Sequence, residues 1–318
     1  MQVSPGILII GYGQHVETKI VPAIQSLDIP LIGIVSSNKS VPKQIAHFKS
    51  IKEIINLLRP SHVFIATNPS KHLNLIKKAT QVSKNLLVEK PITIQNPNFL
   101  QSKKFKTLNI IVKEAMMYKY NYLSSFLEKK RKILEGFKNI EVEFVLPLES
   151  LKKKISFRHS PNFENSMLFD VGCYVFDFIW TFKLFSYKLF IHKKCNFDDG
   201  QAKFVFLKSD NNEVKTLMFK FGYGKKYSNV VKFTSKYDLT YELNPFFYGR
   251  STQVNICIAK NNKKYKKVCN NENCFEKMIG EWYENKNSVI QAQLSNFNRI
   301  SFIQNSLNQL SQDWRSNV

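Results

Sequence analysis

The sequence contains no long uninterrupted hydrophobic run. The most apolar long window, residues 167–191, is broken by two aspartates and two lysines, so no membrane span is predicted. The first residues, MQVSPGILIIGYG, lead directly into a short strand-like run without a basic segment ahead of it, which argues against a secretory signal. We therefore expect a cytoplasmic protein without a membrane partner.

Cysteine is also scarce. The five cysteines are an odd number without the spacing of a disulfide framework, which indicates reduced thiols. Cys269 and Cys274 are separated by four residues, and no His or Cys pair completes a zinc site around them. We expect no metal site.

Acidic residues are outnumbered two to one, with 24 Asp and Glu against 47 Lys and Arg and a net charge of +23. The lysines are spread over the whole length, and the densest cluster, KNNKKYKK at 260–267, is typical of a hairpin turn with a solvated face. No recognised nucleic-acid motif accompanies the charge, so we do not expect a nucleic-acid partner. A surface that attracts anionic metabolites fits the composition better.

In the first third of the chain, apolar strand-like runs alternate with helix-like periods. Strands are predicted at 7–10, 31–35, 62–67, 86–90 and 109–114, and helices at 17–27, 42–48, 50–58 and 70–84. This alternation predicts an α/β Rossmann domain, a doubly wound parallel sheet, over residues 1–118.

After residue 118 the pattern changes to period-two strands. A helix at 123–137, a strand at 140–146 and an apolar helix at 163–182 precede strands at 202–209, 213–221, 229–235, 239–244 and 253–260. We expect an α+β domain over residues 119–318 with a largely antiparallel, open sheet. A closing helix at 288–309 could return to the first domain.

The turn after the first strand carries Gly11-Tyr12-Gly13, where a dinucleotide-binding fold places its glycines. Gly13 would let the backbone approach a pyrophosphate at a helix N-terminus. The third position of the fingerprint holds Val16 instead of Gly or Ala, and a tight turn without a ligand is the alternative.

The end of the second strand offers Ser36, Ser37 and Lys39 where an NAD site usually has an acid for the ribose hydroxyls. Hydroxyls beside a cation suit a 2′-phosphate better than an acid does. NADP(H) is therefore the preferred cofactor and NAD(H) remains possible; a simple polar loop is the alternative.

Several stretches together resemble the glucose–fructose oxidoreductase/inositol dehydrogenase (Gfo/Idh/MocA) family of NAD(P)-dependent oxidoreductases. They are GYG at 11–13, VFIATNPSKH at 63–72, LLVEKPI at 86–92, EAMMYKY at 114–120 and FRHSPNFENSMLFDVGCYVFD at 157–177, with a sheet that is closest in appearance to branches acting on nucleotide-linked sugars. The resemblance covers nearly the whole chain and implies the same two-domain fold.

The resemblance assigns a role to the Glu89-Lys90-Pro91 motif. In the family the peptide before the proline is typically cis and the lysine faces the nicotinamide, so Lys90 would polarise a carbonyl and stabilise alkoxide charge. Glu89 would orient the backbone or the cofactor amide. A surface ion pair capped by a turn proline is the alternative.

The second part of the implied site is Asp170-Val171-Gly172-Cys173-Tyr174. Asp170 and Tyr174 are i and i+4 on a helix and share one face. Many family members have His at the last position, and here Tyr174 would donate a proton beside Lys90; an ordinary core aromatic is the alternative. Gly172 would let the helix pack closely against the cofactor, and Asp177 would bind substrate or cap the helix face.

The complete set of predicted site residues follows from these motifs. The catalytic group is Lys90, Tyr174 and Asp170; the cofactor-binding group is Gly11, Tyr12, Gly13, Gln14, His15, Ser36, Ser37, Lys39, Thr67, Asn68, Pro69, His72, Glu89 and Lys90; and the substrate-binding group is Lys119, Arg158, Asp170, Tyr174 and Asp177.

We therefore predict an NADP(H)-dependent oxidoreductase that transfers hydride between nicotinamide and a hydroxyl or keto carbon of a sugar, such as a nucleotide-linked hexose. The alternatives are a free-sugar, dihydrodiol or inositol dehydrogenase and, from another class, a non-catalytic dinucleotide-binding sensor. By resemblance to the family, a homodimer or homotetramer is expected.

Overall fold

The computed structural model divides the chain into two compact units, Met1–Met116 with Phe275–Ser306 and Met117–Cys274 with Leu307–Val318. It describes residues 4–37, 40–94, 97–102, 105, 108–130, 136–147, 149, 168–184, 188–190, 201–210, 213–235, 237, 239–284 and 290–316. Within these ranges, none of the helices combines the length and the apolar character that a membrane crossing requires.

The first unit contains a six-stranded sheet in the order β3-β2-β1-β4-β5-β6, and every neighbouring pair is parallel. The strands are β1 (Ser4–Ile10), β2 (Leu31–Val35), β3 (His47–Phe48), β4 (Pro60–Ile65), β5 (Asn85–Glu89) and β6 (Ile111–Ala115). The central strands β1, β4 and β5 are almost continuously apolar and buried, as expected for a sheet covered on both faces. The predicted doubly wound parallel sheet is confirmed.

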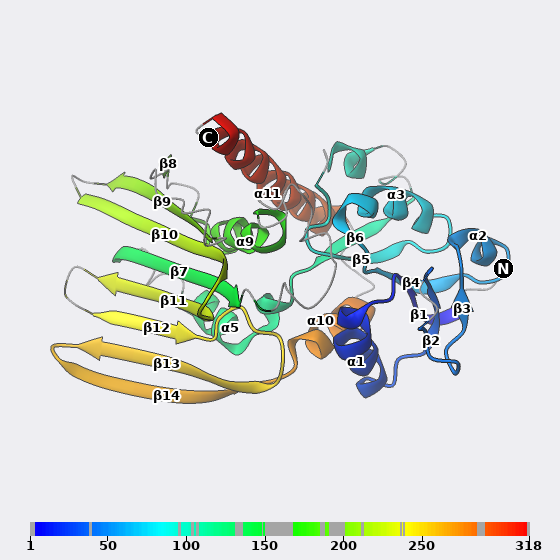
Figure 1. Ribbon diagram of the computed structural model, residues 1–318, viewed down its shortest axis with the longest axis horizontal. Helices are drawn as coiled ribbons and strands as arrows, with labels where there is room; N and C mark the ends of the chain where they lie inside the picture. Colours follow the sequence, from blue (N-terminus) through cyan, green and yellow to red (C-terminus); the bar gives the residue numbers. More distant parts are fainter. Residues whose placement is uncertain are drawn as a thin grey trace. The chain divides into compact units, whose positions relative to one another are not determined.

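Helices cover both faces of this sheet, with α2 and α3 on one side and α1 and α10 on the other (Figure 1). The helical elements are η1 (Val16–Ile20), α1 (Val21–Ser26), α2 (Ile51–Ile55), α3 (Pro69–Ala79), η2 (Pro97–Gln101), α10 (Cys274–Glu284) and α11 (Ile290–Ser316). The chain turns into α3 at Asn68, whose side-chain oxygen accepts a hydrogen bond from the Ser70 amide at 3.0 Å, and Pro69 occupies the first helical position.

The helix predicted at 42–48 is wrong. Residues 42–46 form turns, with the Ile45 amide bonded to the Pro42 carbonyl at 3.0 Å, and His47–Phe48 is a short edge strand paired with Ile34 and Val35 of β2. Pairing with a strand distant in sequence outweighs the local periodicity here.

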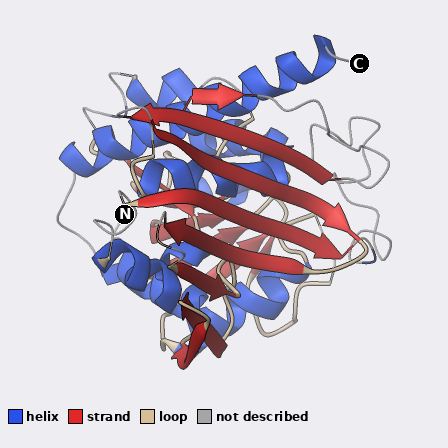
Figure 2. Ribbon diagram, turned by 90° about the vertical axis from the view of Figure 1, so that its left-hand side faces the viewer, coloured by secondary structure: helices blue, strands red, loops and turns tan. Residues whose placement is uncertain are grey.

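The second unit is built on an eight-stranded sheet in the order β14-β13-β12-β11-β7-β10-β9-β8. The strands are β7 (Phe137–Pro147), β8 (Lys188–Phe190), β9 (Gln201–Asp210), β10 (Glu213–Gly224), β11 (Ser228–Ser235), β12 (Thr240–Asn244), β13 (Thr252–Lys260) and β14 (Lys263–Asn271). All pairs are antiparallel except β7 with β10. Figure 2 looks onto this sheet and shows that it does not close into a barrel, so the predicted open, largely antiparallel sheet is confirmed.

The helical elements of the second unit are η3 (Met117–Tyr120), α5 (Tyr122–Lys129), the π-helical turn η5 (Leu168–Gly172) and α9 (Cys173–Thr181), together with the last residues of α11. α9 is strongly apolar and its residues Cys173–Ile179 are all buried. The predicted hairpin at 260–267 joins β13 to β14 through Asn261 and Asn262, which have positive φ angles of 47° and 63°.

Candidate active site

Three neighbouring strands of the first unit end at the same edge of the sheet. β1 leads into the Gly11–Gly13 loop, β4 into residues 66–69 and β5 into Lys90. In open parallel sheets, ligands bind in the crevice outside the carboxyl ends of the strands. The structure therefore brings the cofactor-side residues predicted from these three motifs to one edge.

The two glycines of the first loop serve different purposes. Gly11 has a φ of +101°, and a Cβ atom there would lie 2.2 Å from the Ala66 carbonyl oxygen, so the loop needs glycine to pass the β4 loop. A Cβ atom on Gly13 would meet nothing within 4 Å. Val16 is buried in the core and does not occupy that space. The open side of Gly13 fits the close approach of a dinucleotide pyrophosphate.

The other side chains of this loop differ in exposure: Tyr12 is buried, Gln14 exposed and His15 half-buried. The His15 Nε2 atom lies 2.8 Å from a carboxylate oxygen of Glu89, so an ion pair or hydrogen bond joins the glycine loop to the end of β5. His15 also contacts the Phe275 ring edge-on at 5.5 Å.

The Glu89 carboxylate is 16% exposed. Its burial acts to raise the pKa, but the charge and hydrogen bond of His15, with the charges of Lys90 and His72, outweigh burial and lower the pKa below the ordinary value. Glu89 is thus an ionised group that holds the glycine loop. Its expected contact with the backbone or the cofactor amide stays a prediction.

His72 is completely buried. Its Nδ1 atom lies 2.9 Å from the Pro91 carbonyl oxygen and its Nε2 atom 3.0 Å from the Thr67 carbonyl oxygen, and burial lowers its pKa. A neutral imidazole can donate to only one of these oxygens. His72 therefore donates to one of the two loops, after β4 or after β5, and contacts the other from inside the fold. Of the β4 loop, Thr67 and Asn68 are half-buried and could touch a cofactor.

Lys90 is half-buried and follows β5 directly; the Lys90–Pro91 peptide is cis, as the resemblance implied. The next backbone amide, that of Ile92, donates to the Glu114 carboxylate at 2.6 Å. The other oxygen of Glu114 lies 2.9 Å from Arg299 of α11. The backbone on the C-terminal side of Lys90 is therefore fixed by a buried ion pair.

At the end of β2, the Ser36 amide bonds to the Phe48 carbonyl at 2.9 Å, and the Ser36 carbonyl lies 2.8 Å from the His47 ring. Ser37 is exposed, and Lys39 lies outside the described residues. The described part of this loop, Ser36–Ser37, carries hydroxyls and no acid.

In the second unit, the Asp170 carboxylate is 3% exposed and accepts a 2.5 Å hydrogen bond from the Tyr223 hydroxyl of β10. A Cβ atom on Gly172 would lie 3.2 Å from the Phe221 ring and 3.3 Å from Leu307. The small residue at 172 therefore allows close packing of this helix against β10 and α11, and its expected close approach to the cofactor stays a prediction.

Tyr174 is 5% exposed and lies among aromatic rings. Its ring is edge-on to Tyr118, Phe144 and Phe247, with centroid distances of 5.7, 5.2 and 5.7 Å. This is the environment of an ordinary core aromatic side chain, which is the alternative to a catalytic Tyr174. The catalytic role of Tyr174 stays a prediction.

Asp177 is fully buried and holds two neighbours. It accepts a 2.6 Å hydrogen bond from the Tyr118 hydroxyl, and its other oxygen lies 3.0 Å from the Lys119 amine, whose side chain is 29% exposed. Two of the predicted substrate-binding residues thus pair with each other, and of these two only Lys119 reaches the surface. Arg158, the remaining member of that group, lies outside the described residues.

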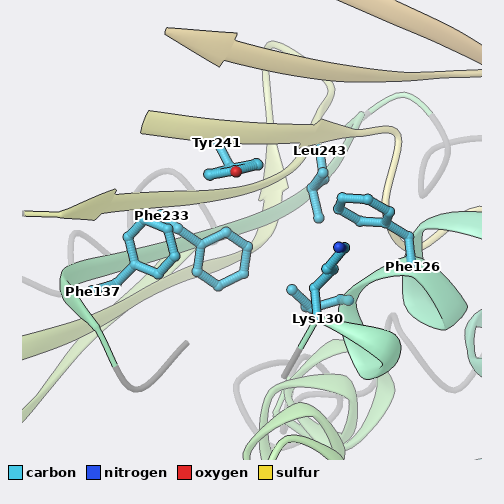
Figure 3. Close-up of a pocket in the computed structure, with 7 residues that line it drawn as sticks. Phe126, Lys130, Phe137, Phe233, Tyr241 and Leu243 are labelled. Atoms are coloured by element: carbon cyan, nitrogen blue, oxygen red, sulfur yellow. The ribbon is translucent and has the colours of Figure 1, made fainter. Parts of the chain in front are cut away.

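An apolar pocket of the second unit lies between α5 and the sheet (Figure 3). It is lined by Phe126, Leu127, Lys130, Phe137, Phe233, Tyr241 and Leu243. The Lys130 side chain points toward Phe126 and Leu243. None of the lining residues belongs to the predicted site, and a single cation among rings offers no pair of groups for proton or hydride chemistry.

Sequence reasoning missed four residues that contact the predicted site residues or their backbone: Glu114, Arg299, Tyr118 and Tyr223. Glu114 and Tyr118 belong to the EAMMYKY motif, so a search of that motif for buried polar contacts could have found them. Arg299 and Tyr223 lie in ordinary amphipathic or alternating patterns and gave no local signal.

Comparison with known proteins agrees with this geometry. Residues 6–108 match the Gfo/Idh/MocA family model, described as an oxidoreductase family with an NAD-binding Rossmann fold. No curated protein matches the chain.

Solved structures match nearly the full length. KijD10, a 3-ketoreductase from Actinomadura kijaniata in complex with NADP and TDP-benzene, is 15% identical with a TM-score of 0.74, over 94% of this chain and 96% of that one. A Gfo/Idh/MocA family oxidoreductase from Vibrio cholerae is 13% identical with a TM-score of 0.68, over 98% and 100% of the two chains. At these identities the likeness shows the fold. The family model, which matches residues 6–108, adds that the first unit is similar to the NAD-binding Rossmann domain of the Gfo/Idh/MocA oxidoreductases.

Proposed function

We propose that the protein is an NADP(H)-dependent oxidoreductase that transfers hydride between the nicotinamide and a hydroxyl or keto carbon of a sugar, with a nucleotide-linked hexose as substrate. The first unit would bind the dinucleotide and the second the substrate. The observation that carries the proposal is the Lys90 loop, which is fixed by His72 and Glu114 at the same sheet edge as the open side of Gly13.

The residues of the first unit fit a dinucleotide. Gly11 and Gly13 would admit the pyrophosphate, and Thr67 and Asn68 would line the adjacent surface. NADP(H), when bound, supplies or accepts hydride at its nicotinamide ring. The hydroxyls of Ser36 and Ser37, with Lys39, would favour the 2′-phosphate over a bare ribose.

Side chains of the protein would stabilise the charge that develops on the substrate oxygen and would transfer its proton. Lys90 would hold the reacting oxygen of the substrate, because an ammonium there stabilises the alkoxide that forms as a ketone is reduced. Tyr174 would donate the proton to that oxygen, and Asp170 would fix the helix that carries Tyr174 through its bond to Tyr223.

The choice of a nucleotide-linked sugar rests on two points. KijD10, which shares the fold, was solved with NADP and TDP-benzene. In this chain Lys119 presents a partly exposed cation next to the Asp170–Asp177 helix, where a diphosphate would find a partner.

One observation favours a second candidate, a dehydrogenase of free sugars or polyols. The Lys119 amine is already paired with Asp177 at 3.0 Å, so its charge is largely compensated before any ligand binds. A neutral substrate that hydrogen-bonds to this pair would need no further cation.

The two candidates separate in a turnover assay. NADPH oxidation is followed with a panel of nucleoside-diphosphate 3-keto and 4-keto hexoses, free keto sugars and keto-inositols, and the reverse reaction is followed with the alcohols. We expect turnover with nucleotide-linked sugars. Turnover only with free sugars would favour the second candidate, and tight NADPH binding without oxidation across the panel would favour a non-catalytic sensor.

A further inference from the structure

A buried ion pair lies behind the backbone of the Lys90 loop. The Glu114 side chain, near the end of β6, is 2% exposed, and Arg299 of α11 is 8% exposed. Burying two charges costs free energy that their attraction only partly repays, so such a pair is weak evidence for a role in stability. Its contacts indicate another role.

The pair binds the backbone directly after Lys90. Pro91 has no N–H group, so the Ile92 amide is the first donor that can fix the chain beyond Lys90. That amide donates to Glu114 at 2.6 Å, while the Pro91 carbonyl oxygen faces His72 at 2.9 Å. Both polar groups of this short segment are thus held by buried side chains.

Arg299 is itself fixed on α11. Its guanidinium donates to the Asn296 side chain at 3.2 Å, and the Asn296 amide donates to the Val112 carbonyl of β6 at 2.5 Å. One turn of α11 is therefore docked on the edge strand that also carries Glu114. The guanidinium stays charged at any ordinary pH, so the carboxylate that holds Ile92 always has a cation beside it.

We propose that Glu114 and Arg299 are positioning residues for Lys90: they fix the backbone that carries its amine, and they do so without touching cofactor or substrate. The proposal rests on the function proposed above for Lys90. A misplacement of about 1 Å can cost about 10²-fold in rate, so loosening this backbone is expected to appear in turnover before it appears in binding.

The experiment compares Arg299→Met with Ile300→Ala. Ile300 is the next residue of the same helix and is 4% exposed in the apolar core of this unit, so its truncation weakens α11 docking and leaves the ion pair in place. Arg299→Lys keeps the charge and serves as the conservative variant. NADPH affinity, thermal stability and turnover with a keto sugar identified by the panel are measured for each.

For Arg299→Met we expect kcat to fall by about 10²-fold, with KM and the NADPH Kd changed by less than about threefold, because the lost interaction positions a group used in the transition state. Arg299→Lys should recover part of the loss. Ile300→Ala should lower Tm and keep kcat near the wild-type value. If Arg299→Met and Ile300→Ala reduce kcat equally at equal loss of Tm, Arg299 only supports the fold and the proposal is wrong.

If no compound of the panel is turned over, the proposed function is contradicted. The positioning role of Glu114 and Arg299 can then still be tested by two measurements that need no substrate. Hydrogen exchange at the Ile92 amide should accelerate by about tenfold in Arg299→Met, relative to the amides of Leu86–Val88, as expected when a bond to a charged group is weakened. Acetylation of the Lys90 amine by acetic anhydride should change in rate relative to Lys84. If both measurements match the wild-type protein, the ion pair does not control the Lys90 loop.

Discussion

The two regions proposed to form the site use their polar side chains differently. Both units contain side-chain pairs, but in the first unit His72 and Glu114 also contact backbone groups beside Lys90, so they define where a segment of chain lies. In the second unit, side chains bind one another: Asp170 with Tyr223 and Asp177 with Lys119. Backbone anchoring presents a loop, whereas side-chain pairing produces a packed helix. The chemistry of the first region therefore follows more directly from its structure than that of the second.

Replacing Lys90 should have the largest effect. Lys90→Ala is expected to lower turnover by about 10²- to 10⁴-fold, the range of positioned acid–base and electrostatic groups, while NADPH affinity changes little because Lys90 is not asked to hold phosphates. Turnover and calorimetric titration with NADPH measure the two quantities.

Lys84 provides the matched control, because it is exposed and precedes the same strand at its other end. Lys84→Ala should keep full activity. If Lys84→Ala and Lys90→Ala lost equal turnover, the effect would come from removing one positive charge and not from the position of Lys90.

A test of Tyr174 decides whether the second unit contributes a catalytic side chain at all. If it donates the proton, Tyr174→Phe should lower kcat by about 10²-fold, and the Lys90→Ala/Tyr174→Phe double variant should be little worse than the poorer single variant, since both serve one step. Near-wild-type activity of Tyr174→Phe would make it a core aromatic, in line with its contacts to Tyr118, Phe144 and Phe247.

How much of this could be predicted from the sequence differs between fold and site. The parallel sheet followed from apolar runs that alternate with helical periods, and the Gly11, Thr67 and Lys90 loops followed from motifs at strand ends. The segment 42–48 failed because its apolar residues fit a helix locally, and only pairing of His47–Phe48 with β2 decides against it.

The supporting residues could not be predicted for a related reason. Tyr223 reaches Asp170 across 53 positions, and its place depends on the register of β10, which the alternation of apolar residues does not specify. Arg299 reaches Glu114 from a helix whose sequence shows only that one side is apolar. Polar contacts between distant elements depend on packing, and packing is not local information.

The paired carboxylates of the second unit should matter for stability. Tyr223→Phe removes the hydroxyl that donates to buried Asp170 and should cost about 1–3 kcal/mol in the free energy of unfolding. Chemical denaturation measures the change. Tyr265→Phe, at a side chain that is 62% exposed, is the control and should cost almost nothing. A cost for Tyr223→Phe no larger than the control would show that the Asp170–Tyr223 bond does not stabilise this helix.

The cofactor preference depends on a smaller effect. Lys39→Ala should weaken NADPH binding by about tenfold, the lower end of a hydrogen bond to a charged group, and leave NADH binding unchanged. Calorimetric titration of the wild-type protein and of Lys39→Ala, each with NADPH and with NADH, tests this directly. Equal affinities of the wild-type protein for NADPH and NADH would contradict the preference for the 2′-phosphate.

The smallest expected effect concerns the pair between His15 and Glu89, which joins the glycine loop to the Lys90 strand. Because the Glu89 pKa in the folded state is lowered below its ordinary value of 4.5, the ionised group stabilises the fold fully above that value, and the contribution is lost as pH falls through the lower folded pKa. His15→Gln removes the cation that lowers this pKa, and since His15 is 39% exposed the change in unfolding free energy should stay below about 1 kcal/mol. That corresponds to a Tm decrease of at most about 2–4 °C above pH 4.5, where Glu89 is ionised, and to a smaller decrease as the pH falls through the folded pKa of Glu89. Glu17→Gln, which removes an exposed carboxylate from the same segment, is the control. If the stability loss of His15→Gln does not shrink as the pH falls below 4.5, the 2.8 Å contact contributes no ionic stabilisation, and the glycine loop is held to β5 by packing alone.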